Sequence, residues 1–326
     1  MPRNDQFRLI ARVARLYYEW DLSQSEIADQ LDLSQATVSR LLRRSIDLGI
    51  TRISVNPPNG VYTELEESLV QKFGLRDAIV VDSLDDDERL IQRDLGAATA
   101  YYLESVIRPK EVIGISSWSG TLLALVDALH PVPRKPGITV VQILGGIGNP
   151  AAEAHATRLT SRMAQLTKGD AVYLPVSGVL TTEAARDILM ADEVAQQAIR
   201  LFDQVTTALV GIGSITPSPL LAQSGNVFSA EELDLLRQEN AVGDILLRYF
   251  DGNGDLVETG LEKRVISMSL EQLAKVSRAI GVAGGSRKYA AILGALRGHW
   301  INTLVTDYST AKRLSSEDAI DASYQS

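Results

Sequence analysis

The chain has 326 residues, 45% of them hydrophobic and 22% charged, which is the composition of a folded globular protein long enough for about two domains. It has no cysteine, and its histidines (His130, His155 and His299) are not at metal-ligand spacing, so we expect no metal site and no cofactor. No apolar run approaches the roughly 18 residues that span a bilayer, and the first residues lack the apolar core of a secretory signal. We therefore expect a cytoplasmic protein without a membrane partner.

The charge is distributed unevenly along the chain. The net charge is -9, but the first 60 residues hold eight arginines against seven acidic residues, a charge of +1 that leaves -10 for the rest. The segment "NPPNG", residues 56–60, follows the basic part and combines two helix-breaking prolines with a flexible glycine. We place a domain boundary there, between residues 1–56 and 57–326.

The first 50 residues carry the pattern of three short helices. A first helix ending near Trp20 is predicted from apolar residues at helical spacing, namely Phe7, Ile10, Ala11, Ala14, Tyr17 and Tyr18. In the following "LSQSEIADQLDLSQATVSRLLRRS", Ser23 and Glu26 have the spacing of a capping box. Ser34 is a natural N-cap for a last helix that turns Val38, Leu41 and Leu42 inward. Helix, short turn and helix form the helix-turn-helix pattern.

The outward side of the last helix has the chemistry of a DNA-reading surface. Short polar groups and a small methyl-bearing residue near its start suit base edges, and guanidinium groups toward its end suit phosphates. A solvated basic face on a purely structural unit is the alternative, but the complete pattern favours double-stranded operator DNA as a partner. The predicted DNA-binding residues are Ser34, Gln35, Ala36, Thr37, Ser39, Arg40, Arg43 and Arg44.

A short β-prone segment follows the three helices. It contains Ile50, Ile53 and Val55 and precedes the two prolines. The segment is either a small wing or an exit strand, and we assign it no role in reading DNA.

From residue 61 onward, helical and strand patterns alternate. Apolar, β-rich runs recur after amphipathic helical stretches, in the order "DAIVV", "EVIGIS", "GITVVQIL", "AVYLPV", "TTALVGIG", "DILLRYF", "AIGVAGG" and "WINTLVTD". Such alternation is typical of an α/β domain with a mainly parallel, Rossmann-like sheet and helices on both faces.

Four loops rich in glycine and serine follow these predicted strands. Ligands of such sheets bind at the carboxyl ends of the strands, where glycine lets backbone amides approach an anion and hydroxyl groups add donors. Each loop alone is an ordinary turn, but four together predict a cradle for a sugar or sugar phosphate. "GGIGNP" lacks the third glycine of a dinucleotide fingerprint, which argues against NAD. The loops are residues 116–121, 145–149, 211–214 and 284–288.

Three charged residues near these loops are candidate ligand contacts. Lys288 ends the fourth loop and suits a phosphate or a hydroxyl group. Arg158 lies just beyond the second loop and is equally well explained as a surface residue of a helix. Asp244 starts a predicted strand, where a carboxylate could also cap a turn.

From about Leu9 to Leu314, the chain resembles the SorC family of bacterial sugar-responsive transcriptional regulators. The resemblance rests on the segments quoted above, taken in order with "VIGISSWSGTLLALVDAL", "VVQILGGIG", "AVGDILLRYFDGNG" and "VAGGSRKYAAILGAL". The resemblance implies an effector domain similar to glucosamine-phosphate deaminases and ribose-phosphate isomerases, a sugar, polyol or sugar-phosphate effector, and assembly as a homo-oligomer, a dimer or tetramer. Trp118 in the first loop is a candidate lid or stacking wall. The first loop reads "SSWSGT", where many members have a shorter tryptophan-glycine version. With Arg158, the predicted effector-binding residues are Ser116, Trp118, Ser119, Gly120, Thr121, Gly146, Gly148, Asp244 and Lys288.

These observations predict a DNA-binding regulator of a carbohydrate catabolic operon. A sugar-phosphate isomerase or deaminase with a fused DNA-binding module is the main alternative, but no carboxylate-histidine pair stands out in the four loops, and we predict no catalytic residue. A recombinase or transposase would need metal-binding acids and a basic DNA track, which the acidic larger domain argues against.

Overall fold

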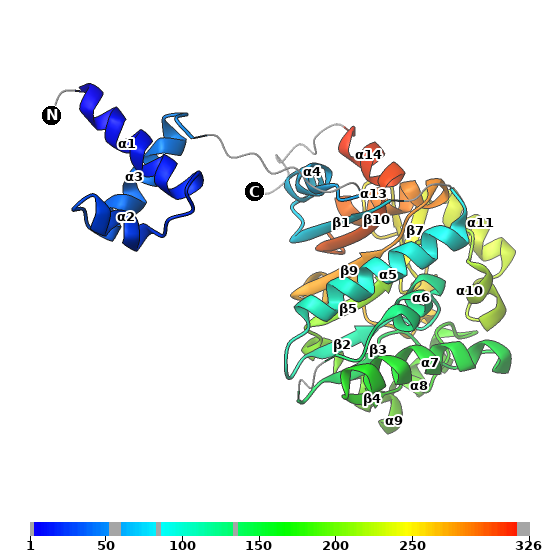
Figure 1. Cartoon of the computed structure of the whole chain (residues 1–326). Coiled ribbons are helices and arrows are strands. Elements are labelled where there is room, and N and C mark those ends of the chain that lie inside the picture. The colour runs from blue at the N-terminus through cyan, green and yellow to red at the C-terminus, as the bar shows by residue number, and fades with distance from the viewer. Residues whose placement is uncertain (1–2, 52–59, 83–85, 133–135, 318–326) are drawn as a thin grey trace. The chain divides into compact units, whose positions relative to one another are not determined.

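The computed structural model describes residues 3–51, 60–82, 86–132 and 136–317. Its internal contacts divide the chain into two compact units, Met1–Pro58 and Asn59–Ser326, which are described separately (Figure 1). No helix among the described residues is long and apolar enough to cross a membrane. Ile53 and Val55, the centre of the predicted wing or exit strand, lie outside the described residues, as does most of the proline-containing boundary.

The first unit consists of three helices, α1 (Arg3–Tyr18), α2 (Gln24–Gln30) and α3 (Gln35–Asp47). They enclose a small core to which α3 contributes Val38, Leu41 and Leu42, as predicted. The apolar face predicted for α1 is partly wrong, because residues Phe7 and Tyr18 are 39% and 42% exposed to solvent. The core reaches α1 only between Leu9 and Tyr17, and Val13 and Leu16 fill it instead.

The turns between these helices follow the predicted capping chemistry. Ser23 and Glu26 form a reciprocal capping box, in which the Ser23 backbone N–H donates to Glu26 at 2.8 Å. The Ser34 hydroxyl accepts from the Thr37 backbone N–H at 3.2 Å and caps α3. Asp32 takes a positive φ of 53° in the connecting turn. The helix-turn-helix pattern is therefore confirmed.

The second unit is built on a seven-stranded sheet in the order β1-β10-β9-β5-β2-β3-β4. All six strand pairings are parallel. Strands β9 and β10 lie in the interior of the sheet and are buried along their whole length, as expected for strands covered on both faces. The strands are β1 (Asp77–Val81), β2 (Val112–Ile115), β3 (Thr139–Gln142), β4 (Asp170–Val172), β5 (Thr207–Gly211), β9 (Arg278–Val282) and β10 (Thr303–Asp307).

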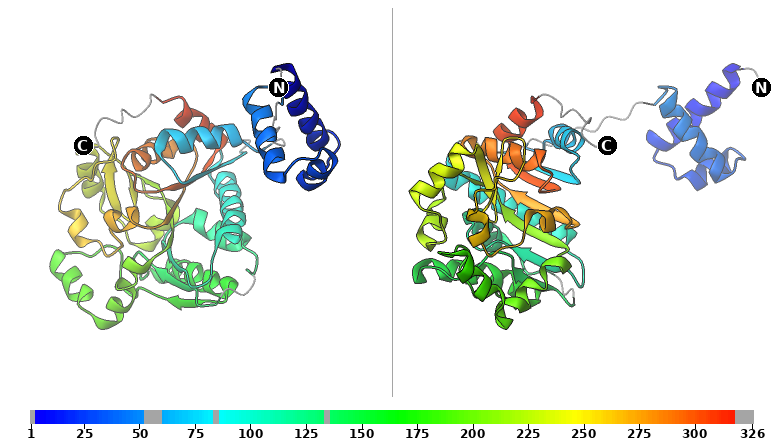
Figure 2. Two further views of the ribbon diagram at one scale, coloured as in Figure 1. Left: turned by 90° about the vertical axis from the view of Figure 1, so that its left-hand side faces the viewer. Right: turned by 180° about the vertical axis from the view of Figure 1, so that it is seen from behind.

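Helices cover both faces of this sheet, so the predicted α/β class is confirmed. Figure 1 shows α5 (Glu88–Val106), α6 (Gly120–Ala128) and α7 (Pro150–Thr167) over one face, where they enclose one hydrophobic cluster. The view from behind in Figure 2 shows the opposite face. A larger hydrophobic cluster fills the rest of this unit's core. The remaining α-helices are α4 (Thr63–Phe73), α8 (Glu183–Met190), α9 (Glu193–Ile199), α10 (Pro219–Ser224), α11 (Ala230–Gln238), α12 (Leu270–Ala274), α13 (Tyr289–Arg297) and α14 (Tyr308–Ser315).

The predicted strand "DILLRYF" is wrong as a member of the parallel sheet. It forms the end of β7 (Ala241–Ile245), a turn and β8 (Arg248–Asp251) in a separate antiparallel sheet with β6 (Gly213–Ser214). Leu246 and Leu247 make the two-residue turn with φ of 57° and 63°. Positive φ matches the twist of a tight hairpin but is rare for leucine, so the sequence carried no ordinary turn signal.

Candidate functional site

A pocket opens at the carboxyl edge of the parallel sheet. It encloses about 620 Å³ of empty space, part of it open to solvent, and three of the four predicted loops line it. The first loop follows β2, the third follows β5 and the fourth follows β9, while the hairpin turn after β7 closes another side. The predicted residues that line it are Ser116, Trp118, Ser119, Gly120, Thr121, Asp244 and Lys288.

The first loop gives the pocket a rigid wall. Trp118 is 5% exposed, and its indole N–H donates to the carbonyl of Gly145 at 3.0 Å. Because the indole is both buried and hydrogen-bonded, its placement fits a wall and not a moving lid. The Ser119 hydroxyl accepts from the Leu122 backbone N–H at 3.3 Å and caps α6, which turns the start of that helix toward the pocket.

Asp244 and Lys288 bring opposite charges to the same pocket. Asp244 is 7% exposed, and its carboxylate accepts from the Leu247 backbone N–H at 3.0 Å. Burial raises the pKa of Asp244 to about 6, against the opposing effects of that hydrogen bond and of the Lys288 charge. Burial also lowers the pKa of Lys288 from its usual value. The pair therefore offers a carboxyl group that titrates close to neutral pH and an amine whose charge lacks full hydration.

Two glycines make room for these side chains. A Cβ atom at Gly213 would lie 2.1 Å from a carboxylate oxygen of Asp244, and one at Gly211 would lie 2.9 Å from the Ser119 hydroxyl. Any larger residue would displace the polar groups that face the pocket. The third loop is therefore glycine-rich because polar side chains pack directly against its backbone.

The predicted DNA-binding residues form the exposed side of α3. Gln35, Ala36, Ser39 and the three arginines are exposed, and Thr37 is partly buried. The Arg40 guanidinium donates to the Thr37 hydroxyl at 3.2 Å, and that hydroxyl contacts the Ser34 hydroxyl at 2.8 Å. Within the part of the chain that the structure describes, none of Arg40, Arg43 and Arg44 forms a salt bridge.

Comparison with known proteins identifies the family. Residues 58–315 match the family model described as "Putative sugar-binding domain", and residues 11–47 match the model for region 4 of sigma-70. The chain is 34% identical to the sorbitol operon regulator of Klebsiella pneumoniae over 320 residues, covering 96% of this chain and 99% of the relative. The chain belongs to the SorC family of transcriptional regulators.

Other SorC-family members match along nearly the same length. The deoxyribonucleoside regulator of Bacillus subtilis is 34% identical over 314 residues, covering 96% of this chain and 99% of the relative. The crystal structure of full-length SorC from Klebsiella pneumoniae superposes with a TM-score of 0.71 at 33% identity, covering 95% of this chain and 99% of that chain. The family and the two-part fold predicted from the sequence are thus confirmed.

Three residues predicted for the effector site of this SorC-family protein lie elsewhere. Arg158 pairs with Asp127 on the surface formed by α6 and α7, outside the pocket. A Cβ atom at Gly146 would lie 2.6 Å from the side chain of Gln142, and one at Gly148 would lie 2.5 Å from the carbonyl of Ser224. These glycines accommodate neighbouring protein atoms, and only Leu144, just before the second loop, lines the pocket.

Arg287 and Gln92 line the SorC-family pocket and were not predicted from the sequence. Arg287 pairs with Glu88 at 2.6 Å and donates to the Ser214 hydroxyl at 3.1 Å, which ties the fourth loop to α5 and β6. Gln92 reaches the pocket from α5. The adjacent arginine and lysine in "GGSRK" could have indicated Arg287, whereas no local pattern singles out Gln92 within its helix.

Proposed function

We propose that this protein controls transcription of a carbohydrate operon by binding operator DNA through α3, and that a sugar phosphate or related sugar or polyol in the carboxyl-edge pocket controls that binding. The observation that carries the proposal is the convergence of Lys288, Asp244 and the Ser116–Thr121 loop on one pocket. The relatives named for sorbitol and deoxyribonucleosides support a carbohydrate ligand.

The chemistry of the pocket suits such a ligand. Lys288 and Arg287 supply positive charge for a phosphate, and the hydroxyl groups of the first loop supply donors and acceptors for sugar hydroxyls. The carboxylate of Asp244 accepts from a sugar hydroxyl without leaving a buried charge unpaired. We assign the ligand set to Ser116, Trp118, Ser119, Gly120, Thr121, Asp244, Arg287 and Lys288.

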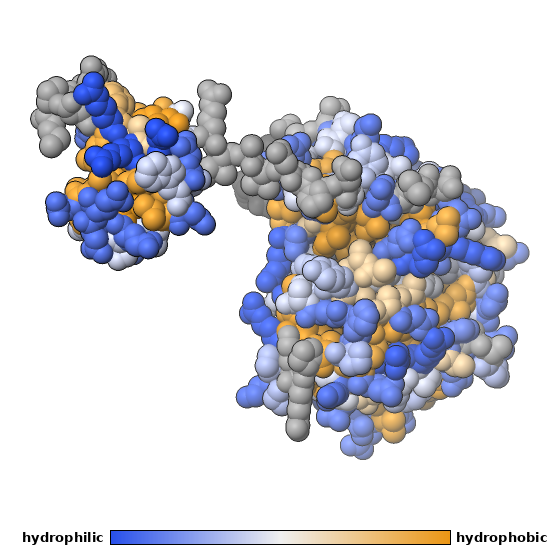
Figure 3. Space-filling view, in the orientation of Figure 1, coloured by the Kyte–Doolittle hydropathy of each residue, from blue (hydrophilic) through white to orange (hydrophobic). Residues whose placement is uncertain are grey.

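The DNA-binding half requires a homo-oligomer, a dimer or a tetramer. One recognition helix reads a single half-site, and a two-fold dimer reads two half-sites about one helical turn or a multiple apart. Exposed apolar side chains on the larger unit, such as Tyr101 at 78% and Ile188 at 73%, supply surface for this association. Figure 3 shows hydrophobic residues among hydrophilic ones on the face of that unit turned toward the viewer.

We propose no catalytic turnover. The relatives are named as regulators, and the residues lining the pocket include no histidine that could pair with Asp244 in proton transfer. Release of product from sugar phosphates by the purified protein, abolished in the Asp244→Asn variant, would contradict this part of the proposal.

A ligand screen and two variants test the function. A thermal-shift screen of sugars and sugar phosphates should find a ligand that stabilises the protein by roughly 2.7 kcal/mol at 100 times its Kd. Fluorescence anisotropy with an operator fragment then measures DNA binding with and without that ligand. Lys288→Ala should weaken ligand binding by roughly 1.5–3 kcal/mol through loss of a charged hydrogen bond, and should keep operator affinity.

The arginine variant should show the opposite pattern. Replacing Arg43 and Arg44 with alanine should weaken DNA binding and leave the ligand affinity unchanged. Lys275→Ala, which changes an exposed lysine outside the pocket, is the matched control and should behave as wild type in both assays. A Lys288→Ala protein that binds and responds to the ligand as wild type would remove this pocket from the mechanism.

A further inference from the structure

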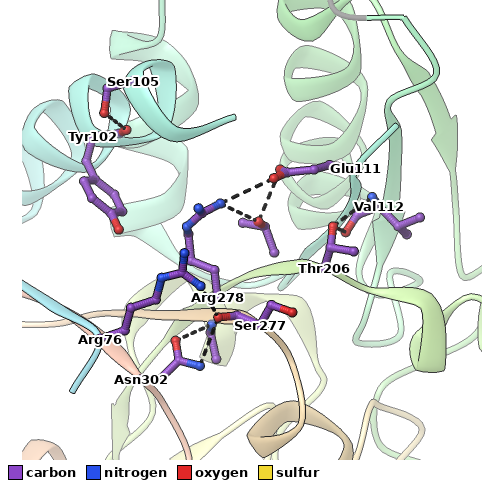
Figure 4. Close-up of polar contacts among 11 residues, drawn as sticks. Arg76, Tyr102, Ser105, Glu111, Val112, Thr206, Ser277, Arg278 and Asn302 are labelled. Carbon is purple, nitrogen blue, oxygen red and sulfur yellow. Dashed lines mark hydrogen bonds and ion pairs between the residues drawn. The ribbon is translucent and has the colours of Figure 1, made fainter. Parts of the chain in front are cut away.

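A second cavity lies at the opposite edge of the parallel sheet, where the strands begin. It encloses about 590 Å³, part of it open to solvent, and none of the glycine-rich loops contributes to it. Its lining comes from the start of β1, the end of α5 with the residues just after it, and the first residue of β9. Figure 4 shows Arg76, Tyr102 and Arg278 around the same space.

Arg278 is the deepest charged group of this cavity. It is 5% exposed, and its guanidinium contacts the Glu111 carboxylate at 3.4 Å and donates to the Thr207 hydroxyl at 3.2 Å (Figure 4). Its Nε–H is buried and has no hydrogen-bond partner among the described residues. A buried donor without a partner is unfavourable, so this atom would gain from an acceptor, which the described residues do not supply.

Two further guanidinium groups line the same cavity. Arg76 and Arg108 are exposed, and within the described ranges neither forms a salt bridge. One guanidinium nitrogen of Arg76 donates to the Ser277 carbonyl at 2.9 Å, which holds the group beside β9 and leaves its other donors available. Three cations thus converge from three separate parts of the chain.

One acidic residue, Asp77, also lines the cavity, and its charge is engaged locally. Its carboxylate accepts from the Ala78 backbone N–H at 3.0 Å, and burial together with the nearby Asp77 carboxylate raises the pKa of Tyr102. Three arginines against one carboxylate give the lining an excess of positive charge, part of which the ion pair of Arg278 with Glu111 offsets. Glu111 stands behind Arg278 and is not part of the lining.

We propose that this amino-edge cavity is a second ligand site, one that binds a phosphate group, either as inorganic phosphate or as a small phosphate monoester. Guanidinium groups donate in pairs to phosphate oxygens. The tetrahedral arrangement of those oxygens lets arginines approach from different directions, whereas a carboxylate offers acceptors in only one plane. A phosphate anion also has the charge opposite to the excess positive charge of the lining, and its oxygens would offer an acceptor for the Nε–H of Arg278.

The test is phosphate binding by the full-length protein, measured by isothermal titration calorimetry at constant ionic strength with chloride as the background anion. All titrations use a Lys288→Ala background, which removes the lysine of the carboxyl-edge pocket. Saturable binding of inorganic phosphate should persist there and weaken at least tenfold when Arg76 and Arg108 are both replaced with alanine. Both arginines are exposed, so these variants should fold normally.

A matched control and a conservative variant complete the test. Arg93→Ala removes an exposed arginine of α5 outside the cavity and should leave phosphate affinity unchanged. Arg278→Lys keeps the buried positive charge but loses the paired N–H donors of the guanidinium group, and should also weaken phosphate binding. The proposal fails if the Lys288→Ala background shows no saturable binding, or if the Arg76→Ala/Arg108→Ala protein binds phosphate as tightly as its parent. Neither result bears on the proposed regulatory function, which concerns the other edge of the sheet.

Discussion

The arginines of α3 are exposed to water, whereas Asp244 and Lys288 in the carboxyl-edge pocket are largely withdrawn from it. Arg40, Arg43 and Arg44 are exposed, whereas Asp244 is buried and Lys288 is partly buried. An exposed charge acts over a distance that salt screens beyond about 8–10 Å. A buried charge is screened far less, and its surroundings shift its pKa. We therefore expect salt to weaken DNA binding by α3, and pH to change the charge of the groups in the pocket.

The largest expected effect is the pH dependence caused by Asp244. Its folded pKa of about 6 lies above its usual value of 3.8, so between these values the folded protein keeps a proton that the unfolded chain releases. The free energy of unfolding should therefore fall, by up to about 3 kcal/mol, as pH rises from about 4 to about 6. Denaturant unfolding at a series of pH values measures this slope, which Asp244→Asn should remove.

Asp255→Asn is the control for that series. Asp255 is exposed, so its replacement should leave the pH dependence as it is in the wild type. An unchanged slope in the Asp244→Asn protein would show that the buried Asp244 carboxyl group does not cause the pH dependence of the unfolding free energy.

A steric change to the pocket should have the next largest effect. In Gly213→Ala, the new methyl group would lie 2.1 Å from an oxygen of Asp244, and the overpacking should destabilise the protein by about 2–3 kcal/mol. Gly252→Ala is matched to it, because the nearest atom to a Cβ there is 3.9 Å away. Thermal unfolding compares the two variants. Equal melting temperatures would mean that the pocket adapts and is not preformed.

The salt dependence of DNA binding tests the other half of the comparison. Replacing Arg43 and Arg44 with alanine should reduce the slope of log K against log salt by about 0.9 for each lost phosphate contact, for all DNA sequences alike. At physiological salt this corresponds to roughly ten- to thirtyfold weaker binding. Anisotropy titrations at several salt concentrations measure the slope. A slope equal to that of the wild type would exclude phosphate contacts by these arginines.

The smallest expected effect concerns the start of the recognition helix. Ser34→Ala removes the hydroxyl that accepts from the Thr37 backbone N–H and should destabilise the first unit by about 1 kcal/mol. Ser39→Ala is the control, because Ser39 is exposed within the same helix and alanine is the better helix former there. Urea unfolding followed by circular dichroism measures the stability of each variant. Destabilisation by both variants alike would show that the cap contributes little.

Local chemistry made much of this structure predictable. The caps at Ser23 and Ser34 and the buried strands were evident because neighbouring residues alone specify them. The hairpin at Leu246 was not evident, since its positive φ depends on a hydrogen bond that buried Asp244 accepts from Leu247. Gly148 was assigned to the ligand because a sequence does not distinguish a glycine that approaches a ligand from one that approaches its own chain.

The amino-edge cavity was also not predictable from the sequence. Arg76, Arg108 and Arg278 are far apart in sequence and stand in no recognisable motif, and only the parallel order of the strands brings them together. Sequence patterns therefore indicated the edge of the sheet where glycine-rich loops gather, and missed the edge where single arginine side chains gather.

The Leu246–Leu247 turn gives the pocket a natural spectroscopic reporter. The backbone N–H of Leu247 points at the carboxylate of Asp244 and so senses its charge directly. In a nuclear magnetic resonance spectrum, the amide proton of this single residue would move as Asp244 gains or loses a proton, and again when a bound hydroxyl group competes for the same oxygen. The protonation state of Asp244 can thus be followed from one backbone signal, without replacing any side chain of the pocket.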